Sequence, residues 1–198
     1  MTALLFPEEQ VLRDTILNDL DRGRPGWDRP HTEAVVYWTK ELIKTCDADP
    51  KVMIAAAYAH DWGYIDLFSE KPDYNAIQNQ KALHMVVGSK RIGELLRTMP
   101  DAFSKDQIAR VMHLVSVHDK LDILKDNDEI LLMEVDTLGA LDADRVTPTF
   151  SKIDNEKYII EVTQKRRPLF AHPVAIDVYN QLFQLRKEYY DSRFGLAR

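Results

Sequence analysis

The sequence predicts an all-α protein with a single domain. Apolar residues recur every three or four positions along almost the whole chain, as they do on one face of a helix, and the alternation typical of strands is absent over any useful length. The chain has 198 residues and shows no repeat, low-complexity tract or linker. This length suits one domain with its own hydrophobic core, so we expect residues 1–198 to form one helical unit.

Eight helices are expected, and signals at their ends support several of them. Pro30 precedes the second helix and Pro100 follows the fourth, as expected for a residue that starts helices well but cannot continue them. Ser104 and Gln107 have the spacing of a capping box at the start of the fifth helix. In chain order the predicted helices cover residues 7–20, 32–46, 50–62, 75–99, 105–118, 127–143, 155–164 and 174–193.

Most of these helices carry an apolar stripe, and five stripes include a histidine or an aspartate. The stripes are His31, Val35, Thr39 and Leu42; Met53, Ala56, Ala57 and His60; Ile77, His84, Gly88 and Leu95; Ile108, Val111, Val115 and His118; Leu132, Val135, Asp136, Gly139 and Ala140; and Val178, Leu182, Leu185 and Tyr189. The last stripe could pack on the core or on a second copy of the chain, which leaves a homodimer open.

Composition and charge exclude several classes of partner. The net charge is −6, from 26 basic and 32 acidic residues, so a nucleic-acid duplex is not an expected partner. No apolar run approaches the ~20 residues of a membrane span, and the first residues lack the pattern of a signal peptide. The single cysteine, Cys46, rules out an internal disulfide and fits a reducing compartment. We therefore expect a cytoplasmic protein without a membrane partner.

Four of the six histidines and two aspartates are predicted to point into the interior: His31, His60, Asp61, His84, His118 and Asp136. Each one alone could be a hydrogen-bonded core residue or a helix cap. Taken together they favour a metal site, because an aspartate buried without a cation costs several kcal/mol, and imidazole with carboxylate suits Fe, Mn, Zn or Ni. His113 and His172 are assigned to the surface or to ordinary hydrogen bonds.

The order His31, His60-Asp61 and Asp136 resembles the HD superfamily of metal-dependent phosphohydrolases. The stretch HDWG resembles the family's His-Asp-hydrophobic-Gly, and EVDTLGAL resembles the helix that carries its last aspartate. The resemblance spans residues 31 to about 141. It implies a helical HD domain with additional helices at both ends of the chain.

The resemblance also implies a set of metal ligands. His31, His60, Asp61 and Asp136 would hold a first divalent metal, Asp61 would bridge, and His84 and His118 would hold a second. The metals would be Fe, Mn, Mg, Ni or Zn, and one metal or two remains open.

Two departures from the family pattern concern specific residues. Many members have Lys after the His-Asp-hydrophobic-Gly motif, where this chain has Tyr64, so a phosphate contact from Lys is missing or is supplied elsewhere. The stretch LDADRV resembles another form of the last motif, which would make Asp142 or Asp144 the ligand. We favour Asp136, because its helix face is apolar and the other two lie near the helix end.

The expected function is that of a metal-dependent phosphohydrolase, in which a metal-bound hydroxide attacks a phosphomonoester or phosphodiester of a nucleotide or small metabolite. Asp61 would act in catalysis, and Lys81 and Arg91, which share the helix face of His84, would bind the phosphate. Other basic residues, including Arg24, Arg29 and Lys120, are interpreted as surface charges, and these three are the alternative phosphate ligands if Lys81 and Arg91 do not bind it. Two alternatives remain: a di-iron oxygenase of the HD type acting on a polyol or phosphonate, and a nucleotide sensor with a structural metal.

Overall fold

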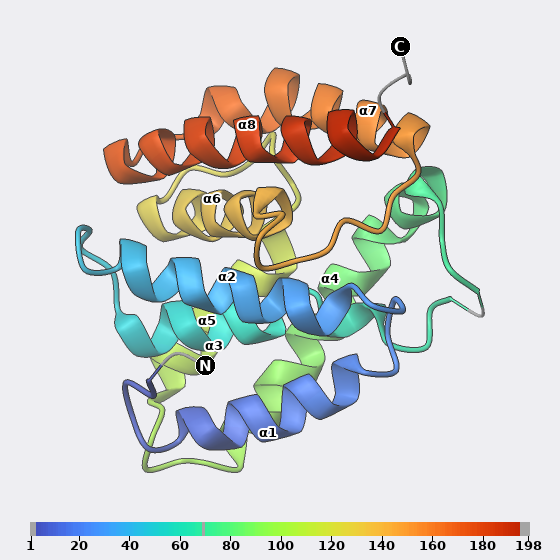
Figure 1. Cartoon of the computed structure of the whole chain (residues 1–198). Coiled ribbons are helices and arrows are strands. Elements are labelled where there is room, and N and C mark those ends of the chain that lie inside the picture. The colour runs from blue at the N-terminus through green and yellow to red at the C-terminus, as the bar shows by residue number, and fades with distance from the viewer. Residues whose placement is uncertain (1–2, 69, 195–198) are drawn as a thin grey trace.

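A computed structural model describes residues 3–68 and 70–194 and confirms the all-α fold, with no strand among these residues. The elements run along the chain as shown in Figure 1. They are α1 (Glu9–Leu20), α2 (Asp28–Leu42), α3 (Pro50–Ala59), η1 (Trp62–Tyr64), α4 (Tyr74–Arg97), α5 (Lys105–Val117), α6 (Asn127–Leu141), α7 (Lys152–Glu161), η2 (Val162–Arg166), η3 (Arg167–Leu169) and α8 (Pro173–Phe194). The turns η1 and η3 are 3₁₀-helical and η2 is π-helical.

The predicted helices are all present, with differences at their ends. The second helix begins at Asp28, four residues before its predicted start. The third ends at Ala59, and the chain then turns through η1. The capping box at Ser104 forms as predicted, with Gln107 donating its backbone N–H to the Ser104 hydroxyl and accepting from the Ser104 backbone.

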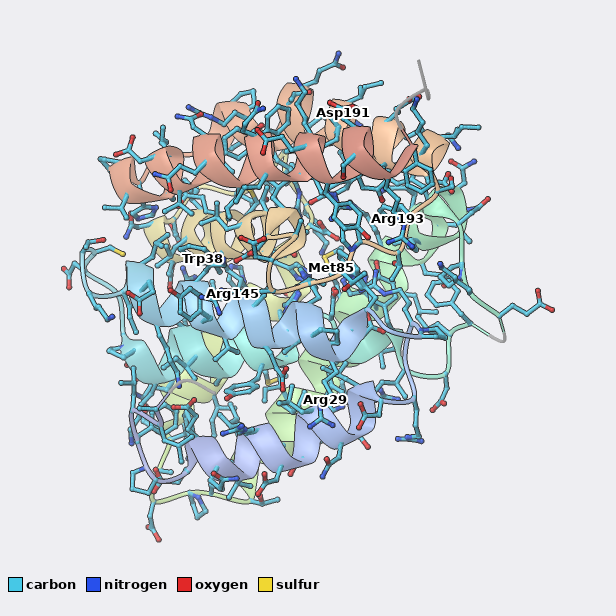
Figure 2. All side chains as sticks on the ribbon, in the orientation of Figure 1. Arg29, Trp38, Met85, Arg145, Asp191 and Arg193 are labelled. Carbon is cyan, nitrogen blue, oxygen red and sulfur yellow. The ribbon has the colours of Figure 1, made fainter. Side chains whose placement is uncertain are left out.

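The helices stack in layers around α3. In Figure 1, α1 lies at the foot of the view, α2, α3 and α5 follow above it, then α6, with α7 and α8 at the top. Helix α3 packs against α1, α2, α4, α5 and α6, and its residues from Val52 to Ala59 are all buried. Side chains fill the space between the layers (Figure 2), and most of the buried apolar ones form a single core cluster.

Helix α8 packs on α6 through a stripe that is displaced from the predicted one. Its buried residues are Ala175, Tyr179, Leu182, Arg186 and Tyr190. Of the predicted stripe only Leu182 is buried, and Leu185 is exposed. The difference arises because a buried arginine, Arg186, donates to the Ala140 carbonyl and to Asn155 and so belongs to the inward face.

A glycine fixes the position of the turn after α3. A Cβ atom at Gly63 would lie 1.9 Å from the carbonyl oxygen of His84 and 2.8 Å from the backbone nitrogen of Gly88. Only glycine allows η1 to lie this close to the backbone of α4. The contact brings the end of α3, with His60 and Asp61, against the part of α4 that carries His84.

No helix within residues 3–68 and 70–194 combines the length and apolarity that crossing a lipid bilayer requires.

Candidate metal centre

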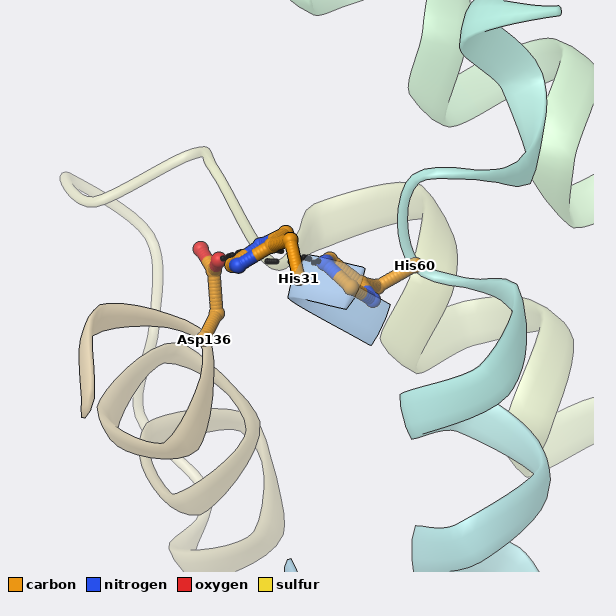
Figure 3. Close-up of side chains that lie close together, drawn as sticks. All are labelled: His31, His60 and Asp136. Carbon is orange, nitrogen blue, oxygen red and sulfur yellow. Dashed lines mark hydrogen bonds and ion pairs between the residues drawn. The ribbon is translucent and has the colours of Figure 1, made fainter. Parts of the chain in front are cut away.

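Three helices bring His31, His60 and Asp136 together in one buried cluster (Figure 3). His31 comes from α2, His60 from the end of α3 and Asp136 from α6. The Nε2 atom of His31 lies 3.0 Å from Oδ1 of Asp136 and 3.1 Å from Nε2 of His60. The third distance, from His60 Nε2 to Asp136 Oδ1, is 3.7 Å. These three atoms could hold a metal ion.

Asp61, His84 and His118 form a second buried cluster of the same kind. The Nε2 atoms of His84 and His118 lie 3.3 Å apart, and His84 Nε2 lies 3.6 Å from Oδ1 of Asp61. Helix α4 supplies His84, and His118 caps the end of α5. All six predicted ligands therefore converge in two groups of three.

Asp61 connects the two clusters. Its Oδ1 faces His84, whereas its Oδ2 lies 3.5 Å from Nε2 of His60 and 3.7 Å from Nε2 of His31. One carboxylate thus offers one oxygen to each side. This is the arrangement that a carboxylate bridging two metal ions requires.

The geometry of both clusters fits divalent metals. Two ligand atoms that sit at about 2.0–2.2 Å from one ion, with ligand angles of about 90–110°, lie roughly 2.8–3.6 Å apart. Most of the closest distances in each cluster fall in this range. His60 donates Nδ1–H to the Ala57 carbonyl at 2.8 Å and His118 donates Nδ1–H to the Val115 carbonyl at 2.9 Å, which leaves the Nε2 lone pair of each ring for a metal.

The charges in the clusters set different protonation states. Burial lowers the pKa of His60, but the carboxylates of Asp61 and Asp136 outweigh it and raise the pKa to about 9. Burial and the neighbouring His118 ring lower the pKa of His84 to about 3. Burial opposes ionisation of both aspartates, yet the cationic neighbours prevail and hold the pKa of Asp61 and of Asp136 well below the usual range. The carboxylates are therefore ionised, as ligands must be.

Two buried arginines contact the candidate ligands. Arg24, in the loop between α1 and α2, donates from Nη2 to Oδ2 of Asp61 at 2.5 Å. Arg166, in the π-helical turn η2, donates to Oδ2 of Asp136. The sequence did not place Arg166. It favoured a surface position for Arg24, with phosphate binding as the alternative, yet Arg24 is only 8% exposed. Each aspartate thus has a protein cation as well as histidines beside it.

A cavity opens onto both clusters. Its empty space, counted together with the open solvent at its mouth, amounts to about 760 Å³. Besides His31, Asp61 and Asp136, its wall contains charged residues and a set of aromatic rings. These are Arg24, Lys71, Lys81, Asp119, Glu161 and Arg166, with Trp27, Tyr64, Tyr74, Phe150 and Tyr158.

Lys81 and Arg91, the predicted phosphate ligands, have different surroundings. Lys81 lines the cavity and donates to Glu161 at 2.9 Å and to Asp119 at 3.4 Å. Arg91 does not line it and donates to the Trp62 carbonyl at 2.8 Å. Lys81 therefore lies at the site, whereas Arg91 contacts η1 outside the cavity.

The alternative ligands for the last motif lie outside both clusters. Asp142 caps the end of α6, is buried, and accepts from the Trp38 indole at 3.0 Å and from Arg145. Asp144 is exposed. Asp142 is buried because the indole and the guanidinium cover it, and it contacts neither cluster.

The two remaining histidines make hydrogen bonds elsewhere. His113 pairs with Glu129 at 2.6 Å, and His172 pairs with Glu134 at 2.6 Å.

Comparisons with protein-family models, curated proteins and solved structures find no match for the chain.

Proposed function

We propose that the protein is a metal-dependent phosphohydrolase that acts on a phosphomonoester or phosphodiester of a nucleotide or small metabolite. The observation that carries the proposal is the position of Asp61, whose two oxygens face separate groups of histidines at the edge of a cavity. Two metals sharing one carboxylate are a frequent solution for hydrolysis of phosphate esters.

The charge around the clusters supports both the metals and the anionic substrate. The partly or fully buried cations are Arg24, Lys81 and Arg166, and the carboxylates in contact with them are Asp28, Asp61, Asp119, Asp136 and Glu161. Three positive and five negative charges leave a net charge of −2 when the histidines are neutral. Two divalent ions would change this to +2, a charge that attracts a phosphate.

The roles of the chain's own residues follow from their positions. When bound, the metals would supply a water with a pKa lowered towards ~7 and would neutralise phosphate oxygens. The four histidines and two aspartates orient the metals, and Asp61 fixes the spacing between them. Lys81 is held between Asp119 and Glu161, which raise the pKa of its amine against the effect of burial, so it keeps a positive charge in the cavity wall.

The proposal is tested by metal analysis and a substrate screen on protein purified without chelators. We expect about two metals per chain, and phosphate release from at least one nucleotide, sugar phosphate or phosphodiester. His84→Ala should hold about one metal and lose turnover. His113→Ala is the matched control, because this histidine pairs with Glu129 outside the site, and it should behave like the wild type.

Two results would overturn the proposal. A metal-loaded protein that releases no phosphate but consumes oxygen with a polyol or phosphonate would be an oxygenase. Tight nucleotide binding without turnover would indicate a sensor.

A further inference from the structure

The two arginines at the candidate metal centre differ in how many of their N–H groups are engaged. Arg166 donates from Nη1 to Asp136 and Thr137, and from Nη2 to Asp119 and Asp136. Its four terminal N–H groups are thus matched by four contacts with protein acceptors. This arginine is committed to holding the carboxylates around it.

Arg24 keeps one terminal nitrogen unused. Its Nε donates to Asp28 at 2.5 Å, and its Nη2 lies 2.5 Å from Asp28 and from Asp61. Nη1 has no hydrogen-bond partner among the described residues, and it is not one of the unpaired polar atoms sealed in the interior. Arg24 lines the cavity, so Nη1 is the nitrogen of its guanidinium that remains for a ligand there.

The guanidinium of Arg24 is fixed before any ligand arrives. Asp28 accepts from the backbone N–H of Arg24 as well as from its side chain. The ring of Tyr64 lies 4.2 Å from the guanidinium carbon, and the same ring stacks on His84 with a centroid distance of 4.0 Å. A rigid, planar donor beside a metal ligand is well suited to bind an oxyanion, because little conformational freedom is lost on binding.

We propose that Nη1 of Arg24 binds a non-bridging oxygen of the substrate's phosphoryl group. The inference deepens the proposed function and rests on it. It assigns to the loop between α1 and α2 the cationic contact that Tyr64 cannot make.

The test uses the metal-loaded protein with inorganic phosphate as the probe, measured by calorimetry, alongside metal content and steady-state kinetics. Arg24→Lys keeps a positive charge beside Asp61 but cannot contact Asp28 and Asp61 and still present two N–H groups to the cavity. We expect wild-type metal content, phosphate binding weakened at least tenfold, and a similar loss in kcat/KM. The control is Arg29→Lys in the first turn of α2; Arg29 is labelled in Figure 2, pairs with Asp21, and does not line the cavity.

Should Arg24→Lys fail to fold, Arg24→Gln with added guanidinium ion replaces it. Guanidinium should restore phosphate binding in that variant, because it can occupy the space that the side chain left. Two results would overturn the inference: wild-type phosphate affinity in Arg24→Lys, or loss of metal together with phosphate binding, which would limit Arg24 to holding Asp61. A failure of the proposed function gives a different result from a failure of the inference about Arg24. If only the proposed function is wrong, the wild type binds phosphate, the binding depends on Arg24, and no ester is hydrolysed.

Discussion

Arg166 donates to Oδ2 of Asp136 from both of its terminal nitrogens, over 2.7 and 2.8 Å. The contact occupies one oxygen of the carboxylate and leaves Oδ1 facing His31 at 3.0 Å. Arg166 reaches this position from the π-helical turn η2, in which the extra residue per turn changes the direction of the side chain. The arrangement makes Arg166 a positioning residue for a candidate metal ligand.

Replacing Arg166 by lysine should weaken metal binding about tenfold to hundredfold, the usual effect of losing a partner of a metal ligand. Lysine keeps the positive charge, so a change in affinity reports on the orientation of Asp136 and not on the local charge. Affinity can be measured by competition with a chelating dye. Lys165→Ala, an exposed neighbour, should leave it unchanged. Equal affinities in Arg166→Lys and wild type would show that Asp136 is oriented without the arginine.

Asp61 and Asp136 should differ in how many metals they control. Asp61 contacts both clusters, so Asp61→Asn should lose both metals, whereas Asp136→Asn should lose one. Metal content per chain, determined by mass spectrometry, checks this. Asp142→Asn is the control: it should keep both metals and lose about 1 kcal/mol of stability, because its contact with Arg145 is weakened. Two metals in Asp61→Asn would mean that this carboxylate does not bridge.

Gly63→Ala should destabilise the fold by about 3 kcal/mol or more, since a Cβ atom there would meet the backbone of α4, which cannot move aside. The matched control is Gly93→Ala in α4. Its Cβ would lie 2.4 Å from Met112 Sδ, in a flexible side chain that can shift, so the loss should be smaller. Urea unfolding of the metal-free variants compares the two. Equal losses would contradict the close approach of η1 to α4.

Much of the fold follows from local signals in the sequence. The spacing of apolar residues indicates each helix, and the same stripes place His31, His84, His118 and Asp136 on inward faces, which is why the ligand set could be assembled without coordinates. These features depend on neighbours within a few residues of one another along one helix.

The sequence misplaced those residues whose position depends on distance along a helix or on partners far away in the chain. Lys81 and Arg91 share a face of α4, but ten residues separate them by about 15 Å along the axis, so only one reaches the cavity. Arg24 sits in a loop without periodicity, and its burial comes from Asp28 and Asp61. Arg166 points inward because of the π-helical turn, which a pattern with a period of 3.6 residues cannot reveal.

Metal binding should release protons, because His60 is protonated in the metal-free protein at neutral pH. Its pKa is raised from 6.5 to about 9, and a metal can bind Nε2 only after the proton leaves. Metal affinity should therefore increase with pH up to about 9. Calorimetric titrations at pH 7, in buffers that differ in ionisation enthalpy, count the protons released. His84 should contribute none, since it is already neutral.

The same pKa predicts how the stability of the metal-free protein depends on pH. A group whose pKa is higher in the folded than in the unfolded state adds stability that is complete below the unfolded pKa. For His60 the free energy of unfolding should thus fall as the pH rises from about 6.5 through about 9. His60→Ala should flatten this decrease, whereas His113→Ala should preserve it. A metal-free protein whose stability holds constant over this range would mean that the carboxylates of Asp61 and Asp136 do not bind a protonated His60, and that metal binds without displacing a proton from that ring.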